Sequence, residues 1–218
     1  MNLLILGGSG RTGLHLITEA LERGYHVKAL VRDPHSISIQ HPELELIQGS
    51  PYNAEDLARA AEGCSAVASS LNLSRTSDWP WAKLRSPLDL LSKSMAHLIA
   101  LDKKRPFVRV VVCTAHGVKE TREQIPGWFR WVIEHSNIRY PYADHERQED
   151  LMKASTMNWV VVRPVGLSNG KSKESVIVSF NNQPKPTLTI PRVDVAKFMM
   201  DTLQSGEYLH QTPTISGK

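Results

Sequence analysis

The chain alternates short apolar runs with longer segments in which apolar residues recur every three or four positions. The short runs are rich in Val, Ile and Leu and are apolar throughout, which is typical of strands buried on both faces of a parallel sheet. We expect such strands at residues 2–6, 26–31, 44–49, 65–71, 107–114 and 158–164. The helical segments between them are expected at residues 12–24, 54–62, 87–101, 127–135 and 143–155. This alternation predicts a doubly wound α/β fold, a parallel sheet with helices on both faces.

The regular alternation weakens after residue 165. The remaining pattern predicts short strands at 175–180 and 187–190, a helix at 193–203 and a last strand at 212–216. No repeat or low-complexity linker interrupts the chain. We therefore expect residues 1–218 to form a single domain, with a small C-terminal elaboration on the substrate side at about 165–192.

Composition narrows the class of protein. A chain of 218 residues with 41% hydrophobic content can fill one core. Its apolar runs are shorter than the roughly 20 residues that a membrane helix needs, and a strand beginning at residue 2 leaves no space for a signal peptide. Cys64 and Cys113 lie in apolar, strand-like surroundings, which favours small buried side chains over a disulfide or a metal site. We expect a cytoplasmic protein without a membrane partner or a bound metal.

The charge pattern does not favour nucleic acid as a partner. The net charge is +4, but the positive residues are scattered and only 6% of the chain is aromatic. A nucleic-acid site would need a basic stripe with stacking rings. The mild positive balance suits a small molecule that carries phosphate.

A glycine-rich loop follows the first strand and precedes the first helix. It consists of Gly7, Gly8, Ser9, Gly10, Arg11, Thr12 and Gly13. In this spacing Gly7 allows the tight turn, Gly10 lets a pyrophosphate approach the backbone, and Gly13 lets the helix pack closely on the sheet. The helix N-terminus then offers free N–H groups and a positive dipole end to the phosphates. The strand, loop and helix together predict a dinucleotide site in a Rossmann-type fold.

The end of the second strand indicates which dinucleotide binds. NAD(H) sites tend to place an acidic residue there for the ribose 2′-hydroxyl, whereas an arginine suits the 2′-phosphate of NADP(H). This strand ends in Val31-Arg32-Asp33. Arg32, with Arg11 from the glycine loop, favours NADP(H), and Asp33 keeps NAD(H) as the less favoured alternative. The competing interpretation is that both arginines are ordinary surface residues.

Four segments together resemble a known family. They are "GGSGRTG", "ALVRDP", "VRPVGLSNG" and "IPRVDVAKFMMDTL". They resemble the atypical short-chain dehydrogenase/reductases, in particular the NmrA-like NAD(P)-binding branch that includes biliverdin-IXβ reductase, also called flavin reductase. The resemblance covers nearly the whole chain and is loose in its middle. It implies that the glycine loop holds the pyrophosphate and that Arg32 selects NADP. It also implies cofactor contacts at Ser70, Leu71, Asn72, Thr114, Pro164 and Val165.

One departure from the family limits the chemistry. The catalytic Tyr-x-x-x-Lys is absent, because Tyr140 is followed four residues later by Asp144, and Tyr142 by Glu146. Without that acid, reduction of an isolated carbonyl is disfavoured, as is an epimerase or dehydratase acting on nucleotide sugars. Flavins, quinones and tetrapyrroles delocalise the incoming charge and can take a proton from solvent. We therefore expect an NADP(H)-dependent oxidoreductase with a small, planar, conjugated substrate.

Three residues are candidates for catalysis. Thr114 ends the fifth strand, near the expected nicotinamide, and His116 follows it in "CTAHG". His145 lies where some relatives carry a lysine and the flavin reductases a histidine, while Tyr142 is a further candidate acid. The competing interpretations are a hydroxyl that caps a strand end for Thr114, a solvated loop histidine for His116 and an exposed helical histidine for His145.

Tryptophans suggest a pocket rim or a partner surface. Trp79 and Trp81 in the loop at 74–86 are expected to stack on a planar ligand or to pack against the following helix. Trp128 and Trp131 have helical spacing, which favours a core or an interface, and their exposure would indicate a partner. A second function thus stays open, namely an NADP-sensing regulatory protein that binds the cofactor without turnover, with a protein partner.

Overall fold

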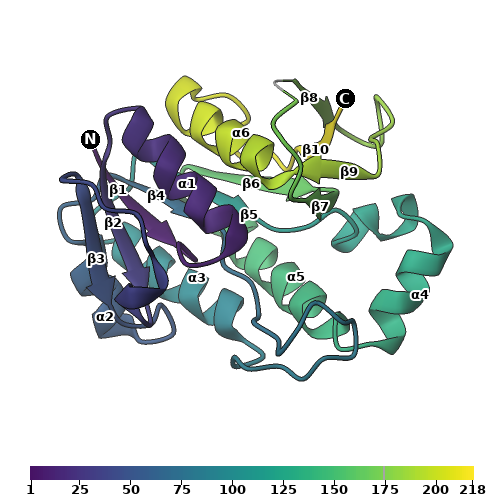
Figure 1. Cartoon of the computed structure of the whole chain (residues 1–218), viewed down its shortest axis with the longest axis horizontal. Coiled ribbons are helices and arrows are strands. Elements are labelled where there is room, and N and C mark those ends of the chain that lie inside the picture. The colour runs from purple at the N-terminus through teal and green to yellow at the C-terminus, as the bar shows by residue number, and fades with distance from the viewer. Residues whose placement is uncertain (174) are drawn as a thin grey trace.

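The chain, described here by a computed structural model for residues 1–173 and 175–218, folds around an eight-stranded sheet (Figure 1). The strand order is β3-β2-β1-β4-β5-β6-β10-β8. The strands are β1 Asn2–Leu6, β2 His26–Val31, β3 Leu44–Gln48, β4 Ala66–Ser69, β5 Arg109–Cys113, β6 Trp159–Pro164, β8 Val176–Ser179 and β10 Thr214–Gly217. All pairings are parallel except that of β10 with the edge strand β8. The predicted doubly wound fold is confirmed.

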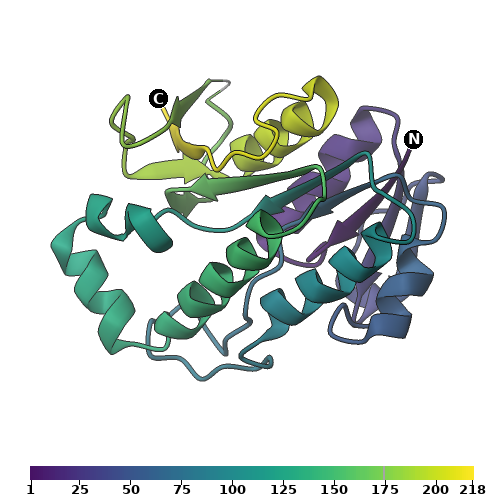
Figure 2. The same ribbon diagram turned by 180° about the vertical axis from the view of Figure 1, so that it is seen from behind.

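Helices cover both faces of this sheet (Figures 1 and 2). The helices are α1 Arg11–Glu22, α2 Ala54–Ala61, α3 Leu90–Asp102, α4 Gly127–His135, α5 Arg139–Lys153 and α6 Arg192–Ser205. Leu3 and Ile5 of β1 pack into the core shared with α1 and α6, whereas Leu4 and Leu6 pack into the core shared with α2, α3 and α5. Successive strand residues point to opposite faces, so burial on both sides explains why the strands are apolar throughout.

Several element boundaries differ from the sequence prediction. Helix α5 begins at Arg139 rather than at residue 143, because Pro141 lies in its first turn, where a missing N–H costs no helical hydrogen bond. Helix α3 begins at Leu90 rather than at 87. Strand β7, Gly166–Ser168, was not predicted and pairs with β9, Thr189–Pro191, in a separate small sheet. Together with the edge strand β8, this sheet makes up the C-terminal elaboration.

Both cysteines are buried and free, as the apolar surroundings predicted. Burial raises the pKa of the Cys64 thiol to about 11 and that of the Cys113 thiol to about 12. Across the described residues, no helix has both the length and the apolar character needed to cross a membrane.

A buried carboxylate joins α5 to α3. Asp144 of α5 is fully buried and accepts hydrogen bonds from the backbone N–H of Leu91 at 2.7 Å and from the hydroxyl of Ser92 at 2.6 Å. These residues form the first turn of α3, whose N-cap residue Asp89 makes no side-chain capping bond. Asp144 therefore satisfies donors that the helix leaves open and lies at the positive end of its dipole. In the Tyr-x-x-x-Lys motif a lysine stands four residues after the tyrosine. Asp144 stands at that distance from Tyr140 and has a structural role here.

We predict that Asp144→Ala lowers the free energy of unfolding by about 2 kcal/mol, because the first turn of α3 then loses its cap inside the core. Urea unfolding followed by circular dichroism measures this change. Asp89→Ala is the matched control and should change stability by less than about 0.5 kcal/mol. Equal effects of the two substitutions would contradict the capping role.

Candidate cofactor and substrate site

The expected ligand edge of the sheet lies where the strand order reverses, between β1 and β4. In doubly wound sheets ligands bind outside the carboxyl ends of the strands at this point. The glycine loop leaves β1 here and enters α1 (Figure 1). The segments that follow β4, β5 and β6 reach the same edge, because these strands run parallel to β1 in one sheet. The geometry brings most of the predicted site residues together.

The glycine loop packs too closely for side chains at two positions. Gly7 has φ +79°, and a Cβ there would lie 2.9 Å from backbone atoms of Ser70. A Cβ on Gly13 would lie 2.0 Å from the carbonyl oxygen of Gly7. The turn out of β1 and the close approach of α1 to the sheet thus take the form that the spacing predicted. Any other residue at position 13 would push the helix away from the loop.

The first turn of α1 presents unpaired donors at this edge. The N–H of Gly10 bonds the Gly7 carbonyl at 3.0 Å, and the first helical bond runs from Leu14 to Gly10 at 2.9 Å. In the described structure the N–H groups of Arg11, Thr12 and Gly13 have no partner within the protein. The first turn also contains no acidic side chain. Bare backbone and open N–H groups fit the pyrophosphate of a dinucleotide.

Four residues of the loop differ in exposure. Gly8 is buried, and a Cβ there would lie 3.0 Å from Ile17 of α1. Thr12 is also buried, whereas Ser9 and Gly10 are exposed. The solvent-facing part of the loop is therefore the part next to the open N–H groups.

The two charged residues after β2 have different surroundings. Arg32 is exposed, and its guanidinium forms no hydrogen bond or ion pair with any described residue. Asp33 accepts a hydrogen bond from the His35 N–H at 3.0 Å and caps the short helical turn Pro34–Ser36. Asp33 is therefore engaged in a local turn, whereas Arg32 is available to a ligand.

Arg11 is already paired. Its guanidinium forms a two-point ion pair with Asp78, at 2.7 and 3.0 Å, which links the glycine loop to the loop at 74–86. Arg192 is the first residue of α6. Partial burial and the nearby positive charge of Arg11 lower the pKa of its guanidinium. The sequence prediction missed Asp78 and Arg192, because no local pattern relates residues so far apart in the chain.

The ends of β5 and β6 continue as a hydrogen-bonded ladder. The Thr114 N–H bonds the Val162 carbonyl at 2.8 Å, and the His116 N–H bonds the Pro164 carbonyl at 2.9 Å. Val165 continues the next ladder through the Ile215 carbonyl at 3.1 Å. Thr114, His116, Pro164 and Val165 are therefore adjacent at the ligand edge, as predicted.

The segment after β4 reaches the same edge. The Ser70 N–H bonds the Leu6 carbonyl at 3.0 Å, which holds the start of this segment beside the end of β1. Leu71 is half-buried, and Asn72 is exposed. The three residues predicted here thus lie next to the glycine loop.

The hydroxyl of Thr114 belongs to a buried charge network. It donates to Glu149 Oε1 at 2.9 Å, and Glu149 also accepts two hydrogen bonds from Arg163, at 3.0 and 2.5 Å. Arg163 donates a further bond to Glu120 at 2.5 Å. Because the Thr114 proton is committed to Glu149, this hydroxyl can only accept a hydrogen bond from a ligand. Neither Glu149 nor the role of Arg163 was predicted from the sequence.

His116 is buried. The competing interpretation, a loop histidine in contact with solvent, is therefore wrong. His116 is 8% exposed, and within the described part of the chain neither ring nitrogen forms a hydrogen bond. Burial and the charge of Arg163 lower the pKa of His116, which keeps the ring neutral near pH 7. The Tyr142 hydroxyl donates to the His116 carbonyl at 3.2 Å, and burial raises the pKa of Tyr142 to about 12. Tyr142 therefore holds its proton and is engaged elsewhere.

His145 is buried within α5. It is 2% exposed, so the alternative of an exposed helical histidine is wrong. Its Nδ1 lies 3.3 Å from the Gln148 side-chain oxygen, and burial lowers its pKa. The catalytic role of His145 stays a prediction, and its burial gives that role no support.

The four tryptophans in the loop at 74–86 and on α4 are exposed. Trp79 is 65% exposed, and its ring lies 5.3 Å from that of Trp81. The Trp81 ring N–H bonds the His135 carbonyl at the end of α4 at 2.9 Å, rather than packing on the following helix α3. Trp128 and Trp131 of α4 are 70% and 53% exposed. Helix α4 thus offers aromatic surface to solvent.

The two buried histidines predict how stability changes with pH. Their pKa values are lowered in the folded chain, so the unfolded chain binds more protons once the pH falls below its histidine pKa of about 6.5. We expect the free energy of unfolding to fall between pH 7 and pH 5. The double variant His116→Asn, His145→Gln should show a shallower dependence in urea unfolding over this range.

The exposed His15 provides the control for this measurement, since His15→Asn should leave the slope unchanged. The lowered pKa of Glu120, caused by its hydrogen bond and proximity to Arg163, affects stability only as the pH falls below about 4.5. An unchanged slope in the double variant would show that the histidines do not cause the loss.

Solved structures with the same fold include a reductase and a protein in complex with NADP. The anaerobillin reductase ChuY of Escherichia coli O157:H7 superposes with a TM-score of 0.80 at 15% identity, covering 99% of this chain and 97% of that one. A short-chain dehydrogenase/reductase of Veillonella parvula in complex with NADP gives a TM-score of 0.75 at 17% identity, covering 99% and 94%. At such identities the similarity shows the fold alone.

Two curated relatives match by sequence. A 3-beta-hydroxysteroid dehydrogenase of Mycolicibacterium neoaurum is 38% identical over 65 residues, which are 30% of this chain and 18% of that protein. The photosystem II assembly factor Ycf39 of Trieres chinensis is 24% identical over 100% of this chain and 64% of its own length. The chain thus spans less than a fifth of the steroid dehydrogenase. The model of the NAD(P)H-binding family matches residues 7–206, and the chain belongs to that family.

Proposed function

We propose that this protein is an NADPH-dependent reductase of the NmrA-like, flavin-reductase-like branch, acting in the cytoplasm on a planar conjugated acceptor. The observation that carries this proposal is that two polar side chains of α5, where a proton donor would stand, are engaged in other hydrogen bonds. Tyr142 donates to a backbone carbonyl, and Asp144 caps α3. Neither is free to protonate an alkoxide, so the acceptor must tolerate incoming charge without a strong acid.

The preference for NADPH rests on the free guanidinium after β2. Arg32 is exposed and unpaired among the described residues, whereas Asp33 is held in its turn. A planar guanidinium suits a 2′-phosphate, and a carboxylate committed to its own backbone is a poor partner for a ribose hydroxyl. The arginines at the starts of α1 and α6 add positive charge nearby. NADH remains the less favoured cofactor.

His116 is the residue proposed to act on the acceptor. NADPH supplies a hydride when it is bound. The His116 ring stays neutral and has no hydrogen-bond partner in the described chain, so its N–H can donate to the acceptor atom that gains negative charge. That atom then takes its proton from water. Thr114 accepts a hydrogen bond from the nicotinamide carboxamide, because its own proton is held by Glu149.

Substitution of Arg32 tests the cofactor preference. We predict that Arg32→Ala weakens NADPH binding roughly tenfold to a hundredfold, because a charged hydrogen-bond pair is lost, and leaves NADH binding nearly unchanged. Isothermal titration with both cofactors measures the difference. Arg105→Ala, at an exposed arginine in the turn before β5, is the matched control. Equal losses for the two cofactors would remove the 2′-phosphate argument.

Turnover tests the reductase itself. We expect loss of NADPH absorbance with at least one of FMN, a quinone and a biliverdin-type tetrapyrrole. His116→Ala should lower kcat roughly tenfold to a hundredfold through loss of a donor to the developing charge, with NADPH affinity retained. The exposed His15→Ala variant should react as the wild type does.

The second candidate function is a cofactor sensor that binds NADPH without turnover and contacts another protein. The exposed Trp128 and Trp131 on α4 favour it, because aromatic side chains grouped on an exposed helix are typical of a protein-interaction surface. The similarity to a protein named as an assembly factor, over this whole chain and 64% of that protein, points the same way. Tight NADPH binding without reduction of any acceptor would favour the sensor over the reductase.

A further inference from the structure

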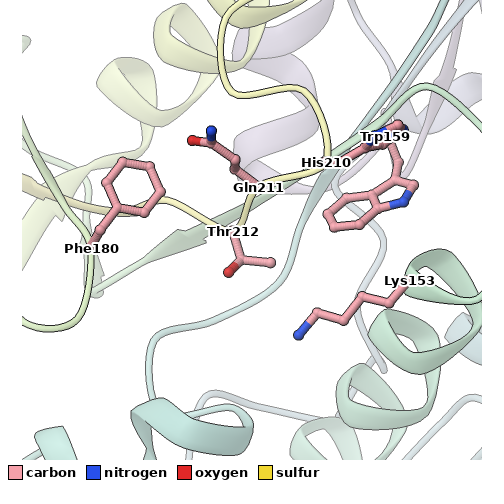
Figure 3. A pocket seen from close by; sticks show the side chains of 6 residues that line it. All are labelled: Lys153, Trp159, Phe180, His210, Gln211 and Thr212. Carbon is pink, nitrogen blue, oxygen red and sulfur yellow. The ribbon is translucent and has the colours of Figure 1, made fainter.

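A second cavity lies at the end of β6 remote from the cofactor edge. Its volume is about 680 Å³, and Trp159, the first residue of β6, forms part of its wall. Pro164, at the other end of the strand, belongs to the cofactor edge. The cavity is lined by Lys153, Trp159, Phe180, His210, Gln211 and Thr212 (Figure 3). Its volume is in the range of small-molecule sites.

Aromatic rings form opposite sides of this cavity. Figure 3 shows Phe180 on one side and Trp159 with His210 on the other. The Trp159 and His210 rings lie 5.5 Å apart, and His210 Nε2 contacts the Met157 carbonyl at 3.0 Å, which fixes the imidazole. On the opposite side the Phe180 ring lies 6.0 Å from that of Tyr208. Because Trp159 is only 5% exposed, the ring surfaces available to a flat apolar molecule are those of Phe180 and of the exposed His210.

Lys153 supplies a positive charge that neighbouring carboxylates compensate only weakly. Its side chain extends from α5 into the space beneath Thr212 (Figure 3). Neither the Lys153 ammonium nor the Thr212 hydroxyl hydrogen-bonds to any described residue. The nearest carboxylate oxygen, Glu149 Oε2, is 3.9 Å from Lys153 and already accepts a 2.5 Å bond from Arg163. The two side chains therefore have donors available for an anion, whereas the Gln211 amide points away from Lys153 in Figure 3.

The backbone on both sides of the cavity adopts left-handed φ values, which on the Phe180 side belong to an ordinary two-residue hairpin turn through Asn181 and Asn182. Tyr208 and His210 have φ values of 60° and 58°, and Asn181 and Asn182, next to Phe180, have 51° and 63°. Residues with a Cβ disfavour this left-handed region, although Asn and His tolerate it better than Tyr. Such conformations persist where the surrounding structure enforces them, often around ligands. The rings are thus set in place before any ligand binds.

We propose that this cavity binds a small planar aromatic carboxylate. The ring of the ligand lies between Phe180 and the Trp159–His210 pair, and its carboxylate accepts hydrogen bonds from Lys153 and Thr212. A single compact cation beside a hydroxyl suits one carboxylate group. The site lies at the opposite end of β6 from the cofactor, so this proposal is independent of the proposed reductase activity.

The test titrates 2-naphthoate into isotope-labelled protein saturated with NADP⁺, which keeps the cofactor edge occupied. We expect amide shifts in the two-dimensional NMR spectrum at residues 180 and 210–212. Lys153→Met should weaken binding about tenfold through loss of a charged hydrogen bond, and Lys153→Arg should restore most of the affinity. The uncharged analogue 2-naphthol should bind the wild type as weakly as 2-naphthoate binds Lys153→Met.

The control is Lys103→Met, which removes an exposed lysine that follows α3 and should leave the affinity unchanged. If Lys153→Met does not fold, the comparison of 2-naphthoate with 2-naphthol on the wild type still tests the charge. The proposal is overturned if 2-naphthoate shifts no amide at these positions. It is also overturned if the acid and the alcohol bind equally well.

Discussion

The arrangement of the substrate side depends on one buried ion pair, Arg163 with Glu149. Both side chains are almost completely shielded from water, at 1% and 0% exposure. Burying two charges is costly, and only close geometry with further hydrogen bonds offsets that cost. Arg163 meets both carboxylate oxygens of Glu149, while Thr114 and Glu120 complete the set. One network thus joins β6, α5, the end of β5 and the segment that follows it.

This network also determines which chemistry the site can perform. In a family with Tyr-x-x-x-Lys, α5 carries the proton donor, but here the helix uses its polar residues to hold the structure together. Glu149 fixes Arg163 and Thr114, Asp144 caps α3, and Tyr142 bonds the loop after β5. The positive charge of Arg163 in turn helps to keep His116 neutral. Under the reductase function that we propose, this arrangement suits acceptors that need a hydrogen bond rather than a strong acid.

The sequence was informative where local pattern and burial agree. Strands buried on both faces read as continuous apolar runs, and Gly7 and Gly13 stand where a Cβ would collide with backbone. It was uninformative about pairs formed by folding. Arg11 with Asp78 and Arg163 with Glu149 join residues whose spacing carries no periodic signal. The first turn of α5 was not predicted, although Pro141 there costs no helical hydrogen bond.

Glu149 also lies one turn before Lys153, near the C-terminal end of α5. Its carboxylate faces Arg163 on one side and lies 3.9 Å from Lys153 on the other. Because Arg163 is closer and binds both oxygens, the Glu149 charge is largely compensated before Lys153 is reached. The Lys153 ammonium is thus only weakly compensated at the remote cavity. The same carboxylate holds the Thr114 hydroxyl at the cofactor edge. The buried pair fixes the donor properties of both sites through one helix.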